Sequence, residues 1–202
     1  MNTTATNPIP QPIDDARIRH SSMPLDAGFT LIELLLVVAV AAVLLSLSAP
    51  SFSRLLHSTR VADASNALLT SMFLARSEAI KRNSRVTLCK SATGTSCATA
   101  GGWEQGWIVF HDTNQDGFRT ADETIIERME PIASGVRVTG NLRVERYVSF
   151  MATGLTRLVG GGFQAGTVVI CNPAVASGEA RQIILNAAGR MRVQKVNATL
   201  CA

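Results

Sequence analysis

The chain has 202 residues and a mass of 21.5 kDa, with 47% hydrophobic and 17% charged residues and a net charge of +4. Soluble domains usually have about 25% charged residues, so the chain is unusually apolar. This composition excludes a wholly disordered chain, because disordered chains are poor in apolar residues. Only one apolar run is long enough to cross a membrane, which excludes a multi-span membrane protein.

The apolar residues are concentrated near the N-terminus. Between Asp26 and Arg54 the only charged residue is Glu33, and Leu34–Phe52 is a run of 19 uncharged residues, enough to cross a bilayer as a helix. Segment 1–28 is polar and contains four prolines, so we expect it to be disordered or removed. A cleaved secretory signal peptide would explain both segments, but the apolar run is long for one and contains a carboxylate.

The sequence GFTLIEL, which begins at Gly28, resembles the processing motif of type IV prepilins. The resemblance implies that a membrane peptidase cuts between Gly28 and Phe29 and methylates the new N-terminus. Glu33 then becomes the fifth mature residue, where its carboxylate can neutralise the amine of a neighbouring subunit. The leader lacks the basic residues usual before the glycine, and its start stays open between Met1 and Met23.

One long helix is predicted to follow the processing site and to end near Asn83. Pro50 predicts a kink or local melting near the end of the apolar run. Beyond it, apolar residues recur at three- and four-residue spacing, which is typical of an amphipathic helix. They are Leu68, Met72, Ala75 and Ala79 on one stripe and Leu69, Phe73 and Ile80 on another. We expect a transmembrane or assembly half over 29–53 and an amphipathic half over 54–84.

From Arg85 the periodicity is that of strands, separated by breaks rich in Gly, Asn and Asp. The predicted strands are Val86–Cys89, Gly106–His111, Thr124–Met129, Val136–Val138, Arg143–Phe150, Gly166–Cys171, Arg181–Asn186 and Arg190–Val196. Strands without helical patterns between them favour antiparallel sheets. The predicted fold class is therefore α+β and pilin-like, with the long helix packed on a β-rich globular domain over 85–202.

Four cysteines allow three disulfide connectivities. A helix that carries the C-terminal part out of the cytoplasm would place them in an oxidising compartment. We favour Cys89–Cys97, which closes a short loop, and Cys171–Cys201, which ties down the C-terminus. Metal binding is the weaker alternative, because the sequence has neither a CxxC motif nor a nearby pair of histidines.

An acidic segment from Asp112 to Glu123 has two interpretations. It fits the calcium-loop pattern D-x-[DN]-x-[DN]-G-x5-E. The calcium ligands would be Asp112, Asn114, Asp116, the Phe118 carbonyl and Glu123. However, Arg119 stands where an apolar residue is usual, and the preceding segment is strand-like. A polar hairpin loop that turns at Asp116 and Gly117 explains the same residues.

Three stretches, VTLCKSATGTSC, GGWEQGWIVFHDTNQDG and ILNAAGRMRV, resemble the FimT/GspH group of minor pilins and pseudopilins. In FimT-like proteins a GRxR pattern is associated with DNA binding. Here Arg190 and Arg192 are two residues apart, so a strand projects both on one face, where guanidinium groups can bind phosphates. The DNA-binding set would comprise Gly189, Arg190, Arg192, Lys195 and Arg181. A solvated hairpin, or ion pairs with acids, would explain the same arginines without DNA.

The charge distribution supports a nucleic-acid partner, because residues 137–202 contain eight basic and two acidic residues, a net charge of +6. The resemblance implies a minor type IV pilin that binds double-stranded DNA without sequence specificity for uptake in natural transformation. The alternative is a GspH-like pseudopilin of a type II secretion system with a purely structural role. No catalytic constellation indicates an enzyme.

Both functions imply the same location and the same protein partners. The chain would be a single-pass inner-membrane protein with a periplasmic C-terminal domain, and it would enter a pilus or pseudopilus on assembly. Its partners would be other pilins or pseudopilins and the prepilin peptidase.

Overall fold

A computed structural model describes residues 28–132, 134–174, 179–197 and 201, without the side chains of residues 47–51, 53 and 54. The expected leader therefore lies outside the described residues, apart from Gly28. The chain divides into two compact units, of which one ends at Leu45 and the other begins at Ser46.

Helix α1 extends from Leu31 to Arg82. Thr30 caps its start, because the Thr30 hydroxyl accepts a hydrogen bond of 3.3 Å from the backbone N–H of Glu33. The Glu33 carboxylate lies in the first turn, where the helix dipole favours a negative charge. Within the described residues, no helix has an apolar stretch that meets the length and hydropathy expected of a membrane span.

The helical backbone continues through Pro50, so the predicted local melting does not occur. A proline inside a helix removes one hydrogen bond, and here the helical turns on both sides persist. Helix α1 ends where Asn83 adopts a positive φ of 49°, a left-handed conformation that commonly terminates helices.

The residues described after α1 form two antiparallel four-stranded sheets with a short 3-10 turn, η1 (Trp103–Gln105), before the second strand. The strands are β1 (Val86–Lys90), β2 (Trp107–His111), β3 (Ile125–Met129), β4 (Arg137–Gly140), β5 (Tyr147–Phe150), β6 (Gly166–Cys171), β7 (Glu179–Leu185) and β8 (Met191–Asn197). The first sheet has the order β3-β2-β1-β5 and the second β4-β6-β7-β8. The α+β class is confirmed.

Every predicted strand has a counterpart, but the expected strand Arg143–Phe150 is too long. Only its second half forms β5, since the first half is a turn in which the backbone N–H of Val144 donates to the carbonyl of Asn141. The carbonyl of Val144 accepts a hydrogen bond from the buried indole of Trp103. The turn thus has a tertiary hydrogen bond in place of ladder pairing.

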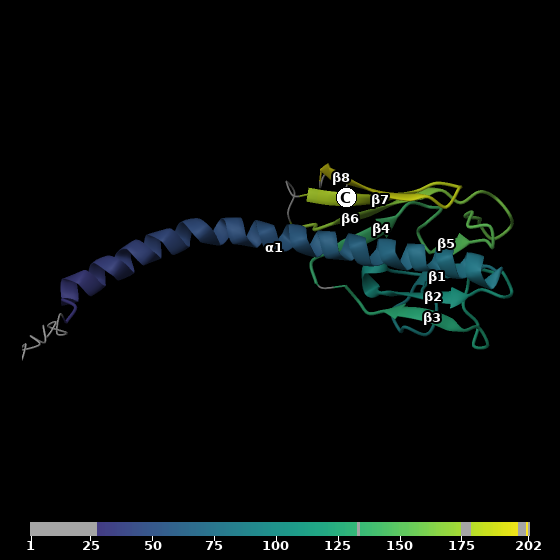
Figure 1. Ribbon diagram of the computed structural model, residues 1–202, viewed down its shortest axis with the longest axis horizontal. Helices are drawn as coiled ribbons and strands as arrows, with labels where there is room; N and C mark the ends of the chain where they lie inside the picture. The colour runs from purple at the N-terminus through teal and green to yellow at the C-terminus, as the bar shows by residue number, and fades with distance from the viewer. Residues whose placement is uncertain (1–27, 133, 175–178, 198–200, 202) are drawn as a thin grey trace, which may run out of the picture. The chain divides into compact units, whose positions relative to one another are not determined.

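The C-terminal part of α1 lies beside the strands (Figure 1). One apolar stripe of this part belongs to a buried cluster that also includes residues of both sheets. Its predicted members are all fully buried: Leu68, Met72, Ala75 and Ala79. The second predicted stripe is only partly covered, because Phe73 is 45% and Ile80 51% exposed. The first stripe is therefore the face of α1 that contributes to the core.

The structure contains two disulfides, and they are the two favoured pairings. Cys89–Cys97 joins β1 to the loop that follows it, with a Cα–Cα distance of 5.6 Å. Cys171–Cys201 joins the end of β6 to a residue beyond β8, with a Cα–Cα distance of 5.8 Å. The second bridge anchors the chain after the β7–β8 hairpin.

Candidate nucleic-acid interface

The GRxR residues lie at the turn between β7 and β8 and at the start of β8. The register pairs Leu185 with Met191, so the connecting turn runs from Asn186 to Arg190. Asn186 closes this turn twice: its side-chain oxygen accepts the N–H of Arg190 at 2.9 Å, and its carbonyl accepts the N–H of Gly189 at 2.9 Å. The turn thus has a defined conformation.

Gly189 cannot be replaced without disturbing this turn. Its φ of +70° lies in the left-handed region that other residues rarely adopt. A Cβ atom at this position would also collide with the carbonyl oxygen of Gly154, in the loop that follows β5. The glycine of the GRxR pattern therefore allows the turn to pack directly on another segment of backbone.

Two side chains from other elements hold this packing in place. Arg76 of α1 donates from Nε to the Gly154 carbonyl at 3.1 Å. Thr156 donates from its hydroxyl to the Asn186 carbonyl at 3.0 Å and from its backbone N–H to the Ala187 carbonyl at 3.2 Å. Sequence reasoning missed Arg76, Gly154 and Thr156, because they act through contacts between segments far apart in the chain.

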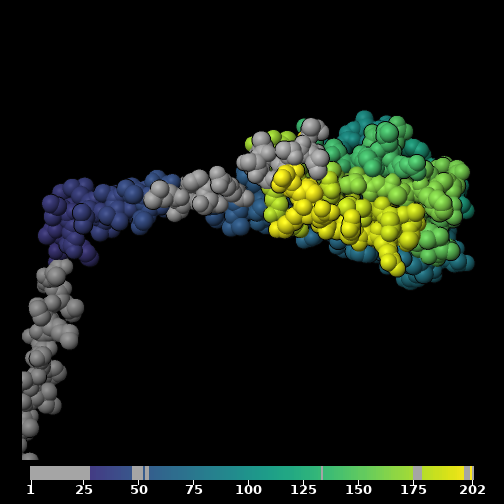
Figure 2. Space-filling model, turned by 90° about the horizontal axis from the view of Figure 1, so that it is seen from above, coloured from purple at the N-terminus to yellow at the C-terminus, as the bar shows by residue number. Residues whose placement is uncertain are grey.

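Arg190 and Arg192 are exposed, whereas Met191 and Val193 between and after them pack against the core. The predicted alternation of exposed arginines with core-facing apolar residues is therefore present at the start of β8. Within the described residues, neither arginine forms an ion pair with a carboxylate. Figure 2 shows the C-terminal strand region, in yellow, as an open part of the surface. Both guanidinium groups are available to an external ligand.

Lys195 and Arg181, the other basic residues of the expected set, have a different environment. They face each other across β8 and β7, and Glu179 lies beside both. The Glu179 carboxylate is 3.1 Å from Lys195 Nζ and 3.7 Å from Arg181 Nε. One acid thus offsets part of their charge, and within the expected DNA-binding set only Arg190 and Arg192 have no carboxylate partner among the described residues.

The carboxylates of the acidic segment bind the protein's own backbone and hydroxyl groups. Asp112 Oδ2 accepts the Thr87 hydroxyl at 2.7 Å and the Gly117 N–H at 3.1 Å. Glu123 Oε1 accepts the Thr113 N–H at 2.7 Å, and Oε2 accepts the Thr120 N–H at 3.0 Å. Burial raises the pKa of the Asp112 carboxyl.

These contacts do not support the calcium-loop interpretation, for which the ligands were Asp112, Asn114, Asp116, Phe118 and Glu123. The Asp116 carboxylate accepts hydrogen bonds from the side-chain amide of Asn114 and from the backbone N–H of Phe118. In the part of the chain that is described, no three His, Cys, Asp or Glu side chains are grouped so as to hold a metal ion. A polar loop closed by its own carboxylates accounts for the segment.

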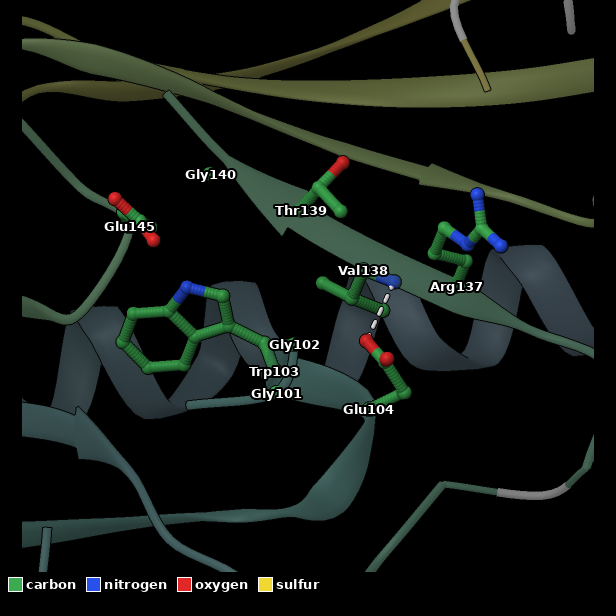
Figure 3. A pocket seen from close by; sticks show the side chains of 9 residues that line it. All are labelled: Gly101, Gly102, Trp103, Glu104, Arg137, Val138, Thr139, Gly140 and Glu145. Atoms are coloured by element: carbon green, nitrogen blue, oxygen red, sulfur yellow. Dashed lines mark hydrogen bonds between the residues drawn. The ribbon is translucent and has the colours of Figure 1, made fainter. Parts of the chain in front are cut away.

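A groove between η1 and β4 is poorly suited to phosphates. Figure 3 shows Glu104 and Glu145 on either side of Trp103 in this groove. Glu104 Oε2 accepts the backbone N–H of Val138 at 2.9 Å, so its carboxylate caps the free edge of β4. Two carboxylates would repel a phosphate, although Arg137 also lines the groove.

An α+β chain whose first helix follows a prepilin-like processing sequence belongs to the class of pilin-like subunits. Residues 64–189 match the family described as type II transport protein GspH, and residues 23–49 match the prokaryotic N-terminal methylation motif. The first match covers more than half of the chain, and the chain belongs to the GspH family. It is a pilin-like chain of this family with a prokaryotic N-terminal methylation motif.

The chain is also similar to two solved structures. The type IV minor pilin FimU of Pseudomonas aeruginosa is 17% identical, with a TM-score of 0.49 over 68% of this chain and 90% of that chain. The minor pseudopilin EpsH from the type 2 secretion system of Vibrio cholerae is 10% identical, with a TM-score of 0.46 over 67% of this chain and 96% of that chain. A comparison with curated protein sequences finds no match.

Proposed function

We propose that this chain is a minor type IV pilin that binds double-stranded DNA without sequence specificity, for uptake in natural transformation. One observation carries the proposal. Arg190 and Arg192 project from the same face of a fixed turn and edge strand, are exposed, and have no carboxylate partner among the described residues. Such guanidinium groups fit phosphate oxygens through paired donors.

The geometry favours contacts with the DNA backbone over contacts with bases. The two arginines lie on a tight turn and an edge strand, and neither is on a helix that could enter a major groove. Phosphate contacts hold any sequence equally well, and their strength falls steeply with salt because they release counterions. The Lys195–Glu179–Arg181 cluster would contribute less, because its acid offsets part of its charge.

The N-terminal segment would deliver this domain to the surface of the cell. Cleavage after Gly28 by the prepilin peptidase would make Phe29 the methylated N-terminus, with Glu33 in the first helical turn. The large apolar side chains that follow are exposed, as in Leu31 at 77% and Leu35 at 60%. An apolar surface of this kind needs a cover, which the inner membrane would provide before assembly and neighbouring pilin helices afterwards.

The second candidate is a pseudopilin of a type II secretion system with only an assembly role. It is favoured by the matched family, which is described as a type II transport protein. In that case the basic turn (residues 186–192) would contact other subunits, or simply remain solvated, and DNA would have no part in its function.

Complementation of a deletion strain tests the proposal. The strain would receive the wild-type gene, the double variant Arg190→Gln/Arg192→Gln, or Arg128→Gln, which removes an exposed charge from β3. We expect the double variant to retain pili and lose DNA uptake, whereas Arg128→Gln retains both. Normal uptake with the double variant would contradict the proposal. Loss of type II secretion in the deletion strain, with normal uptake, would favour the pseudopilin.

A further inference from the structure

A second cluster of arginines lines a cavity of about 450 Å³ on the globular domain. Its lining residues are Arg85, Gln115, Met151, Arg157, Gly160 and Gly161. Arg85 immediately precedes β1, and the last four residues belong to the loop between β5 and β6. None of the lining residues is acidic, in contrast to the groove between η1 and β4.

Arg85 is buried and forms no close ion pair among the described contacts, although the buried Asp112 carboxylate interacts with it electrostatically. Arg85 is 6% exposed, and its Nε has no hydrogen-bond partner in the described structure. Its Nη1 reaches the Gln115 carbonyl only at 3.4 Å. A buried cation is costly unless a partner satisfies it.

Arg157 brings a second guanidinium group to the same cavity, and its position is fixed. Its Nη1 donates to the Gly161 carbonyl at 2.8 Å, and its guanidinium carbon lies 4.6 Å from the centre of the Phe163 ring. These contacts leave other N–H donors of the group unused, and no ion pair within the described chain includes Arg157.

The glycines of the lining keep the cavity open. Gly160 and Gly161 have φ values of +93° and +94°, and no atom lies within 4 Å of where a Cβ would stand on either. The turn is closed internally, because the Gly161 N–H donates to the Leu158 carbonyl at 3.0 Å. The backbone therefore borders the cavity without filling it.

We propose that this cavity is a phosphate-binding subsite, in which Arg85 and Arg157 bind the oxygens of one phosphate group. Guanidinium groups bind phosphate oxygens through forked donors, and two such groups can each take an oxygen of the same phosphate. The phosphate can come from a DNA strand or from free inorganic phosphate. The DNA source rests on the proposed function, and the subsite itself does not.

The loop that lines the cavity also supports the basic turn, which favours the DNA source. Gly154 packs against Gly189, and Thr156 donates to two carbonyls of the turn. The next residue, Arg157, lines the cavity. One loop therefore joins the two arginine clusters, and a strand that crosses the turn could place a further phosphate at the cavity.

The first arm of the test is calorimetric titration of the full chain, held in non-ionic detergent, with inorganic phosphate. We expect saturable binding that weakens at least tenfold in Arg157→Gln and is unchanged in Arg128→Gln. Arg157 is preferred for substitution because Arg85 is buried, and circular dichroism would verify the fold. The variant Arg85→Lys retains the positive charge but loses the forked donors of the guanidinium group. It should therefore also weaken phosphate binding.

The second arm is the salt dependence of binding to duplex DNA. If a DNA phosphate occupies the cavity, Arg157→Gln should lower the slope of log K against log salt by about 0.9, the value for one phosphate contact. Saturable phosphate binding with an unchanged DNA slope would support the subsite and assign it to free phosphate. Absence of saturable phosphate binding together with an unchanged slope would overturn the subsite. The DNA proposal would then still stand or fall separately on the Arg190→Gln/Arg192→Gln variant.

Discussion

The acidic loop (residues 112–123) lies between two strands, and the basic turn (residues 186–192) includes the first two residues of β8. Both concentrate charge, but they use it in opposite ways. In the acidic loop, Asp112 and Glu123 are buried and accept hydrogen bonds from the chain's own donors. In the basic turn, Arg190 and Arg192 are exposed and unpaired within the described structure, and a side-chain amide closes the turn.

The two segments differ in whether their charged side chains are used inside the fold or left exposed. Each segment fits a binding pattern in the sequence, one for calcium and one for DNA. In the basic turn, Asn186 and Thr156 hold the backbone, and Arg190 and Arg192 are left to solvent. We therefore expect changes in the acidic loop to affect stability and changes in the basic turn to affect binding.

The largest effect on stability is expected for Glu123→Ala. This variant leaves the backbone N–H groups of Thr113 and Thr120 without their charged acceptor, at a cost of about 3 kcal/mol and a melting temperature lower by roughly 10 °C. DNA affinity should not change. The matched control is Asp122→Ala, which removes an exposed neighbouring charge. A melting temperature equal to that of wild type would contradict the role of the acidic loop in stability. Loss of DNA binding by a folded variant would contradict its separation from the binding surface.

Gly189→Ala tests whether the geometry of the basic turn matters apart from its charge. The added Cβ meets the Gly154 carbonyl in a left-handed backbone conformation, so we expect a loss of about 2 kcal/mol and a weaker DNA affinity with both arginines present. Gly162→Ala is the control, because its Cβ would make only an ordinary contact at 3.7 Å with Leu158. Unchanged DNA binding in a gel-shift titration would show that the turn need not be fixed.

Glu179→Gln should strengthen DNA binding, because it releases Lys195 and Arg181 from their shared acid. An exposed ion pair is worth at most about 1 kcal/mol, so the gain should not exceed about fivefold. It should disappear at high salt, where surface charges are screened. Unchanged DNA affinity of Glu179→Gln at low salt would contradict a contribution from Lys195 and Arg181.

The smallest effect concerns Asp112, whose pKa is raised mainly by burial. Between the ordinary and the raised pKa the folded state binds more protons than the unfolded state, so stability falls as pH rises through this window. Wild type should therefore gain stability relative to Asp112→Asn as the pH decreases from about 7 to about 4. Chemical denaturation at several pH values measures this difference, and a difference independent of pH would contradict the assigned environment.

Periodicity predicted most of the fold, because burial repeats locally along each element. It placed the buried stripe from Leu68 to Ala79 and the alternation of Arg190 and Arg192 with Met191. It failed at residues 143–146, which form a turn whose Val144 carbonyl accepts a hydrogen bond from Trp103. Local patterns contain no information about such distant contacts.

The candidate site shows the same limit. The sequence identified the two arginines, but it could not show that Gly189 packs on Gly154, since that contact joins distant segments. It also could not separate Lys195 from Arg192, because the pairing with Glu179 depends on the register of β7 and β8. Spacing alone likewise did not distinguish a calcium loop from a loop closed by its own carboxylates.

The most direct test of the central claim is the salt dependence of DNA binding by wild type and by Arg190→Gln/Arg192→Gln. Fluorescence anisotropy with two duplexes of unrelated sequence would give the affinity at each salt concentration. We predict equal affinities of wild type for both duplexes, and a slope of log K against log salt that is smaller by about 1.8 in the double variant, equivalent to two lost phosphate contacts. An unchanged slope and affinity in the folded double variant would contradict the claim.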